Sequence, residues 1–122
     1  MNAKNISMLL GIVFLVVGVL GFLPNPIVSP GGIFAVNELH NIVHILSGIA
    51  LVLGATLLSG SASLILKIFG IVYLLVAILG FVMPGNYLLG LILINDADRW
   101  LHLVLAIVIL GAGFTLSNRS TA

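Results

Sequence analysis

The chain has 122 residues, of which 61% are hydrophobic and only 6% are charged. Soluble domains carry roughly 25% charged residues, so this composition excludes a fully water-exposed surface and indicates that much of the protein faces lipid. The formal net charge of +1 argues against a nucleic-acid partner, and the absence of cysteine excludes disulfides, iron–sulfur ligation and thiol catalysis.

Four apolar segments are expected to be helices that cross a membrane. They cover Ile6–Leu23, Glu38–Leu58, Leu64–Met83 and Ala97–Leu116, and each is close to the roughly 20 residues that a helix needs to span a bilayer core. Helix is the only open-chain structure possible there, because lipid cannot satisfy free backbone amides. The first segment is long and ends in Phe-Leu-Pro-Asn-Pro rather than at a small-residue cleavage site, so we expect it to be retained and not removed as a signal peptide.

The first half of the chain is repeated in the second half. The run that begins at Gly11 is GIVFLVVGVLGFLP, and it recurs from Gly70 as GIVYLLVAILGFVM, 59 residues later. The run that begins at Asn37 is NELHNIVH, and it recurs from Asn95 as NDADRWLH, 58 residues later. Each copy contains two of the four apolar segments, so each copy is expected to form one helical hairpin.

The repeat predicts a fold. Residues 1–122 are expected to form a single transmembrane domain, with repeat copies at 6–58 and 64–116. Because each copy contains two helices, both copies enter the membrane in the same direction. The predicted fold is therefore an all-α, integral membrane four-helix bundle built from two tandem hairpins, a parallel repeat with a pseudo-two-fold axis along the membrane normal. Helices two and four carry small residues on the faces that bear their histidines, so we expect these two helices to approach one another.

Basic residues predict the orientation in the membrane. Those expected on the side of the N-terminus are Lys4, Lys67 and Arg119. The acidic residues are expected on the opposite side, and Arg99 lies with them; they are Glu38, Asp96 and Asp98. The positive-inside rule then predicts a multi-pass protein of the bacterial inner (cell) membrane with both termini in the cytoplasm. Trp100 and Tyr87 are expected near the outer interface, where amphipathic rings are common.

Four polar residues at the outer ends of helices two and four are the candidate site. His40 and His44 are one helical turn apart, and Asp98 and His102 repeat that spacing in the second copy. Three histidines and one carboxylate that converge in a bundle are a suitable ligand set for zinc, iron or manganese. Facing imidazoles could instead ligate a haem. The sequence therefore leaves a transition metal and haem open as cofactors.

Two other interpretations of these residues stay open. His44 and His102 could hydrogen-bond to Asp98, to backbone carbonyls and to each other, which would make a polar clasp that pins helix two against helix four. They could also handle a proton or a small solute, although the cytoplasmic halves of the helices are nearly free of polar side chains, which argues against a continuous pore. No catalytic motif accompanies the cluster, which favours a non-enzymatic accessory or self-associating subunit. The expected partners are the lipid bilayer and either further copies of the chain or a larger membrane complex.

Three polar residues near the cluster are expected to have structural roles. Asn37 and Asn95 precede helices two and four, and their side chains are expected to cap the exposed backbone amides. Tyr73 lies mid-helix where the first copy has Phe14, and its hydroxyl is expected to find a backbone or serine acceptor.

The pattern of polar residues also resembles a known family. The runs are Asn37-x-x-His40-Asn41-x-x-His44-x-x-x-Gly48 and Asp98-x-x-x-His102-Leu103. They resemble a family of small bacterial membrane proteins that is known only as a domain of unknown function, and Arg99 stands where that pattern has asparagine. The resemblance implies a four-helix integral membrane protein and no established activity or cofactor. The four-helix layout is also similar to that of the DoxX-type membrane proteins, which are linked to redox processes.

Overall fold

The computed structural model describes residues 1–118 and confirms an all-α protein with four helices, each long and apolar enough to cross a membrane. The helices are α1 (Ala3–Leu20), α2 (Glu38–Ala55), α3 (Ala62–Val82) and α4 (Asp96–Thr115). A short 3-10 turn, η1 (Ser59–Ser61), joins α2 to α3. Arg119, which was used to predict the membrane orientation, lies outside the described residues.

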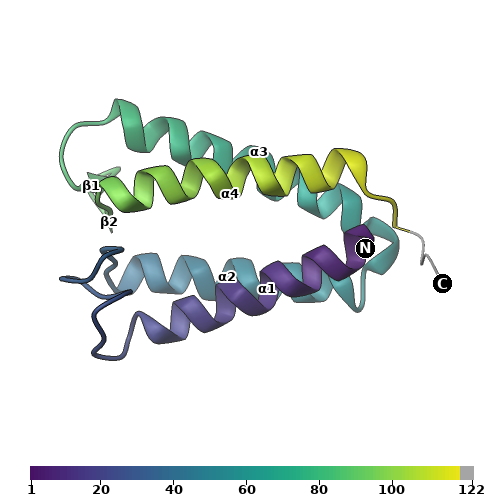
Figure 1. Cartoon of the computed structure of the whole chain (residues 1–122), viewed down its shortest axis with the longest axis horizontal. Coiled ribbons are helices and arrows are strands. Elements are labelled where there is room, and N and C mark those ends of the chain that lie inside the picture. Colours follow the sequence, from purple (N-terminus) through teal and green to yellow (C-terminus); the bar gives the residue numbers. More distant parts are fainter. Residues whose placement is uncertain (119–122) are drawn as a thin grey trace.

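The helices form the two predicted hairpins. Figure 1 shows α1 beside α2 and α3 beside α4, as two layers that lie along one another. The N-terminus lies at the same end as the described end of α4, because the backbone N–H of Ala3 donates to the carbonyl of Ser117. The η1 turn is also at this end, which we call the terminal end (Figure 1). Residues 21–37 and 83–95 form the connections at the opposite end, the loop end.

Glycines explain why the helices within a hairpin are so close. A Cβ atom at Gly11 of α1 would lie only 2.9 Å from the backbone nitrogen of Val52 in α2. Gly70 of α3, which aligns with Gly11, has the same relation to Leu110 of α4, at 2.8 Å. In lipid, where packing replaces the hydrophobic effect, such small residues allow two helix backbones to approach closely. The glycines thus join the helices in the pairs α1–α2 and α3–α4.

The expectation that helices two and four would approach one another is wrong for their backbones. Among residues 1–118, contacts between the hairpins are made mainly by α1 with α3 and by α2 with α3. The reason is that small residues on the histidine-bearing helices serve the hairpin interfaces: Gly48 packs on Leu15 of α1, and Gly113 packs on Lys67 of α3. Helices α2 and α4 contact one another through the rings of His40 and His102, whose centroids lie 5.6 Å apart.

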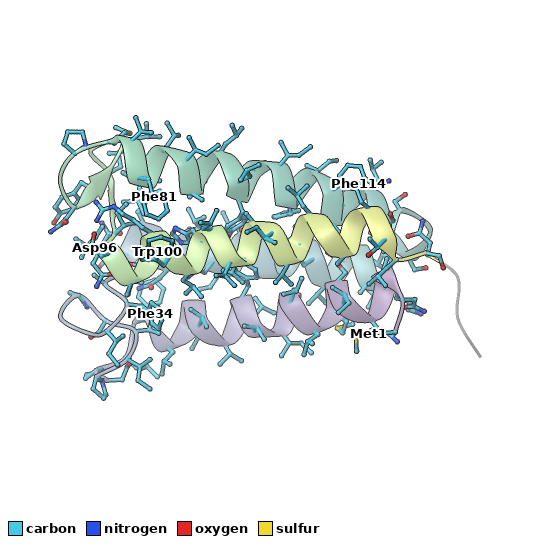
Figure 2. All side chains as sticks on the ribbon, turned by 45° about the horizontal axis from the view of Figure 1, so that its top comes forward. Met1, Phe34, Phe81, Asp96, Trp100 and Phe114 are labelled. Carbon is cyan, nitrogen blue, oxygen red and sulfur yellow. The ribbon has the colours of Figure 1, made fainter. Side chains whose placement is uncertain are left out.

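The centre of the bundle contains aromatic rings from both hairpins. Phe14 of α1 and Tyr73 of α3 lie with their ring centroids 5.2 Å apart. Leu51, Leu66 and Ile109 are fully buried around them. The side chains that face outward are mostly large and apolar, as Figure 2 shows along the length of the helices. This arrangement is that of a small membrane protein.

The loop end contains two short strands that the sequence did not predict. Strands β1 (Tyr87–Leu88) and β2 (Ile92–Leu93) pair antiparallel between α3 and α4. Residues 89–91 join the strands, and Leu89 and Gly90 have positive φ angles of 54° and 71°, a backbone conformation that is common in tight hairpin turns. Leu88 is buried, with 4% of its surface exposed, so the hairpin folds inward over the end of the bundle.

The two N-cap asparagines also hold the loop end together. As predicted, the Asn37 side chain accepts from the N–H of His40, and the Asn95 side chain accepts from the N–H of Asp98. Each amide nitrogen then donates across the bundle. Asn37 donates to the carbonyl of Leu91 at 3.0 Å, and Asn95 donates to the carbonyl of Ile33 at 2.9 Å. Each hairpin is therefore bonded to the connecting loop of the other.

Charged and aromatic side chains lie where the sequence predicted along the long axis. Asp96 and Trp100 are at the loop end in Figure 2, and Met1 and Phe114 are at the terminal end. Trp100 is exposed and makes an edge contact with Phe81, with ring centroids 5.0 Å apart. Its placement fits a ring at a membrane interface. Which end faces the cytoplasm stays a prediction.

Candidate functional site

Three histidines come together inside the loop end of the bundle. His40 and His44 lie in the first two turns of α2, and His102 lies at the second turn of α4. Each offers one ring nitrogen, and these three nitrogens all lie within 4.8 Å of one another. The residues are 2%, 6% and 5% exposed, respectively. The structure thus places imidazoles from both hairpins at one buried point.

The rings are arranged around His40. Its ring centroid lies 4.5 Å from that of His44 and 5.6 Å from that of His102. Aromatic rings support the outer two imidazoles in matching ways. Phe14 lies edge-on to His44 at 5.7 Å, and Tyr73 lies edge-on to His102 at 6.2 Å. These contacts limit the rotation of the imidazoles and keep them directed at one another.

A hydrogen bond determines which ring nitrogen of His40 carries the proton. Its Nδ1 lies 2.7 Å from the carbonyl oxygen of Leu93 in β2. A carbonyl can only accept, so Nδ1 carries the proton and Nε2 of the neutral ring keeps its lone pair. Metal-binding histidines in proteins commonly donate their second nitrogen to a carbonyl in this way, which fixes the tautomer and the ring orientation. The β-hairpin therefore prepares His40 to act as a ligand through Nε2.

His44 has an unpartnered polar atom. Its Nδ1 is buried and has no hydrogen-bond partner among the residues that the structure describes. Leaving a buried polar atom without a partner costs about 1–3 kcal/mol, and such atoms are rare in folded proteins. The His44 Nδ1 is therefore a buried polar atom whose hydrogen-bonding capacity is not satisfied by residues 1–118.

Asp98, the predicted fourth member, is not part of this group. Its carboxylate accepts from the backbone N–H of Asn95 at 3.0 Å, while the Asn95 side chain accepts from the N–H of Asp98. This reciprocal pair is a capping box at the start of α4. Asp98 is buried just N-terminal to His102, but the close group of ring nitrogens consists of the histidines alone.

A cavity of about 100 Å³ adjoins the histidines. Its polar wall is completed by Tyr73 and Ser47, which confirms that the Tyr73 hydroxyl has a serine acceptor: it donates to Ser47 Oγ at 3.0 Å. The remaining wall is apolar and comes from α2, α3 and the β-hairpin; these residues are Val43, Phe69, Val72, Val76, Leu88 and Ile92. The site therefore has room for a few small atoms beside the imidazoles, in largely apolar surroundings.

The donor set limits which metals would fit. Imidazole nitrogen suits zinc, copper, iron and nickel, whereas magnesium and calcium require oxygen ligands. Three protein ligands with an open fourth position are typical of catalytic zinc sites, with Zn–N bonds of about 2.0–2.1 Å and hence nitrogens about 3.4 Å apart. The nitrogens lie within 4.8 Å of one another, so small side-chain rotations would complete such a site. The three histidines fit one transition-metal ion.

Several features of the site had no detectable signal in the sequence. The Leu93 carbonyl is a backbone atom, and nothing in the side-chain pattern marks it. Phe14 reads as an ordinary apolar residue of helix one. The fold brings both to the histidines because the β-hairpin closes over the loop end and the two hairpins cross near Phe14 and Tyr73.

Comparison with known proteins gives the family and nothing further. No curated protein and no solved structure matches the chain. One family model, described as a domain of unknown function (DUF4383), matches residues 4–115. The match includes all four helices and the three histidines. The chain therefore belongs to the DUF4383 family.

Proposed function

We propose that this protein binds a transition-metal ion in the membrane through His40, His44 and His102. The observation that carries the proposal is the convergence of three buried ring nitrogens within 4.8 Å of one another, from two different hairpins. Among the described residues, the ring of His40 has a hydrogen-bond partner, the carbonyl of Leu93. The rings of His44 and His102 have none within residues 1–118, and the His44 Nδ1 is also buried, so these imidazoles are free to bind an ion.

The polar-clasp interpretation is less well supported by the geometry. A clasp would have His44 and His102 bonded to Asp98, to backbone carbonyls or to each other. Asp98 instead accepts from its own N-cap residue, and His44 Nδ1 has no partner in residues 1–118. In this part of the chain, the only direct hydrogen bond from the cluster to the other hairpin is the one between His40 and Leu93. Two buried imidazoles that add no such bond are better explained as ligands.

A single ion fits the site better than a haem does. Pockets that hold molecules of drug size have volumes of about 300–1,000 Å³, and the cavity beside the histidines has about 100 Å³. The β-hairpin and the Tyr73–Ser47 hydrogen bond would both have to move to admit a porphyrin. An ion with one water or one small ligand needs no such change.

The test uses the purified protein in mild detergent, titrated with Zn²⁺ and with Co²⁺. We expect one ion per chain and visible Co²⁺ absorption bands of a four-coordinate site. His44→Gln should weaken binding by about a hundredfold or more, since structural zinc sites gain about 10–16 kcal/mol from four ligands. His44→Cys replaces one good zinc ligand by another and should retain most of the affinity.

Ser47→Ala is the matched control for the ligand variants. Ser47 lies one turn along α2 from His44 and lines the same cavity, but it is outside the group of ring nitrogens. This variant should bind metal as the natural protein does. If His44→Gln bound Zn²⁺ as tightly as Ser47→Ala, or if the natural protein bound less than one ion per chain, the proposal would be wrong.

Membrane orientation and assembly stay predictions. Lys4 and Lys67 at the terminal end support a cytoplasmic location for that end. The chain contains no cysteine, so single cysteines introduced at the loop end and at the terminal end can be labelled in whole cells with a membrane-impermeant maleimide. Labelling of the loop end alone supports the predicted orientation. An accessory or self-associating role would show as co-purifying protein or as a dimer in mild detergent.

The tandem repeat is also kept as a proposal. It is supported by contacts that recur at the same offsets. Gly11 packs on Val52 as Gly70 packs on Leu110. Asn37 donates to the carbonyl of Leu91 as Asn95 donates to the carbonyl of Ile33. Repeat copies of residues 6–58 and 64–116 predict that the two hairpins, expressed as separate chains, assemble into one bundle. Failure to assemble would count against this proposal and leaves the metal site untouched.

A further inference from the structure

A second pocket reaches the histidine cluster from the other side of the bundle. It lies between α1 and α4 and has a volume of about 180 Å³. Its walls are Leu10, Val13, Phe14, Val17, Leu101 and Leu105, together with the imidazole of His44. His44 also lines the first cavity, which lies between α2 and α3. The cluster therefore has a pocket on each flank.

The two pockets occupy corresponding positions in the two halves of the chain. The residues of α1 that line the second pocket correspond to the residues of α3 that line the first, with an offset of 59. The residues of α4 that line the second pocket correspond in the same way to the residues of α2 that line the first, with an offset of 58. The chemistry differs at two corresponding places: Tyr73 and Ser47 in the first cavity are matched by Phe14 and Leu105 in the second. The α1–α4 pocket is thus wholly apolar except for His44.

The packing of the helices explains why the second pocket exists and where it opens. Glycines bring helix backbones together within each hairpin, at Gly11 and Gly70, whereas α1 and α4 make few contacts with one another. Val13, on the rim of the second pocket, is 46% exposed. Both walls belong to helices apolar enough to span a membrane, so the pocket opens sideways to the hydrocarbon of the bilayer and not to water.

We propose that this α1–α4 pocket binds an uncharged, lipid-soluble molecule no larger than a single ring and places it against His44. Apolar walls exclude an ion, because a charge buried there would have no partner. An apolar cavity of about 150 Å³ stays dry and can hold benzene, so a pocket of about 180 Å³ has the size for one ring. The imidazole of His44 supplies the one polar contact, which favours a ring with a single polar group.

The proposal goes beyond metal binding and does not depend on it. Its test uses metal-free protein in nanodiscs of deuterated lipid, with the methyl groups of valine and leucine labelled with ¹³C. Benzene and phenol are the probes. Both should shift the methyl signals of Val13, Val17, Leu101 and Leu105 in a saturable way, and phenol should bind more tightly because its hydroxyl can reach His44.

Two variants make the test specific. Val13→Phe fills the mouth of the pocket and should abolish the saturable shifts. Ile12→Phe adds a ring at the neighbouring position of α1, which is 48% exposed and is not a wall residue, and should leave them unchanged. Helical circular dichroism and Zn²⁺ binding that match the natural protein in both variants separate a blocked pocket from a failed fold or a lost metal site.

Three results would overturn the proposal. One is a set of probe shifts spread evenly over lipid-facing methyl groups, with no saturation. Another is saturable binding that Val13→Phe leaves intact. The third is a lipid acyl chain that occupies the pocket, seen as cross-relaxation from protonated lipid to the Leu101 and Leu105 methyl groups that benzene fails to displace. If the natural protein did not bind Zn²⁺, the metal proposal would be wrong and the pocket proposal would be unaffected.

Discussion

Substitution of Gly11 tests how the hairpins are held together. In Gly11→Ala the new methyl group would lie 2.7 Å from Val52 Cγ2, 2.9 Å from the Val52 backbone nitrogen and 3.0 Å from the Gly48 carbonyl oxygen. Carbon atoms in favourable contact are about 3.5–4.0 Å apart. Two of the three neighbours are backbone atoms that cannot rotate away, so α1 must move off α2. Overpacking of this kind costs about 1–3 kcal/mol.

The same change elsewhere provides the control. Gly70→Ala would place its methyl group 2.8 Å from the Leu110 backbone nitrogen and should cost about as much as Gly11→Ala. Gly111→Ala, in α4, meets no atom within 4 Å, and alanine is favoured over glycine in a helix interior by about 0.8–1.0 kcal/mol. Because the gain in helix propensity is common to both substitutions, the free energies of unfolding of Gly11→Ala and Gly111→Ala should differ by the overpacking cost of about 1–3 kcal/mol.

The assay is unfolding in mixed micelles with increasing SDS, followed by circular dichroism, from which the free energy of unfolding is extrapolated. Gly11→Ala and Gly70→Ala should unfold at lower SDS fractions than the natural protein, and Gly111→Ala at an equal or higher fraction. If Gly11→Ala were as stable as Gly111→Ala, the close approach of α1 and α2 would not be a feature of the folded protein.

Three further predictions concern the loop end and the site. Asn95→Ala should lower the free energy of unfolding by about 1–2 kcal/mol, since it removes the cap of α4 and the bond to the facing loop; SDS unfolding measures this. Tyr73→Phe keeps the ring but leaves Ser47 without its donor, and should cost about 1 kcal/mol in the same assay. Metal should be released as the pH falls, because protons compete for the imidazole nitrogens; Zn²⁺ titrations across a pH series follow this.

Each of these predictions has a contradicting result. If Asn95→Ala unfolded at the same SDS fraction as the natural protein, the bond from Asn95 to the Ile33 carbonyl would not stabilise the fold. If a Tyr73→Phe, Ser47→Ala double variant lost the full sum of the two single costs, the two hydroxyls would not interact. Zn²⁺ affinity that stays constant over a pH range in which free imidazole titrates would mean that histidine does not bind the ion.

Local features of the sequence predicted the helices and their caps well. Helix length follows from the thickness of the bilayer, so a run of about 20 apolar residues is informative by itself. Asn37 and Asn95 cap the helices that directly follow them, and a bond between residues three apart is decided by local geometry. The four helices and both caps therefore needed no knowledge of tertiary contacts.

The position of Asp98 in the sequence is compatible with two different roles. Its spacing from His102 suits a metal ligand, and its spacing from Asn95 suits a capping box. The carboxylate forms the capping box, whose bonds close as soon as the helix starts. Its Oδ2 accepts from the N–H of Asn95, and the three histidines supply a ligand group without it.

The packing between the two hairpins could not be predicted, because small residues occur on more than one face of a helix. The faces that carry His44 and His102 also carry glycine and alanine, which suggested contact between helices two and four. Small residues on these helices pack within their own hairpins instead, Gly48 on Leu15 and Gly113 on Lys67. Such a choice depends on which backbones fit together in three dimensions, and the spacing of small residues in one helix does not contain that information.

The most direct test of the central claim is X-ray absorption spectroscopy of the zinc-loaded protein. The account predicts three imidazole nitrogens at about 2.0–2.1 Å from the ion, with the multiple scattering that is typical of histidine, and loss of one of them in His44→Cys with the gain of one sulfur. A spectrum with oxygen ligands alone, or with fewer than three imidazoles in the natural protein, would show that His40, His44 and His102 do not hold the metal together.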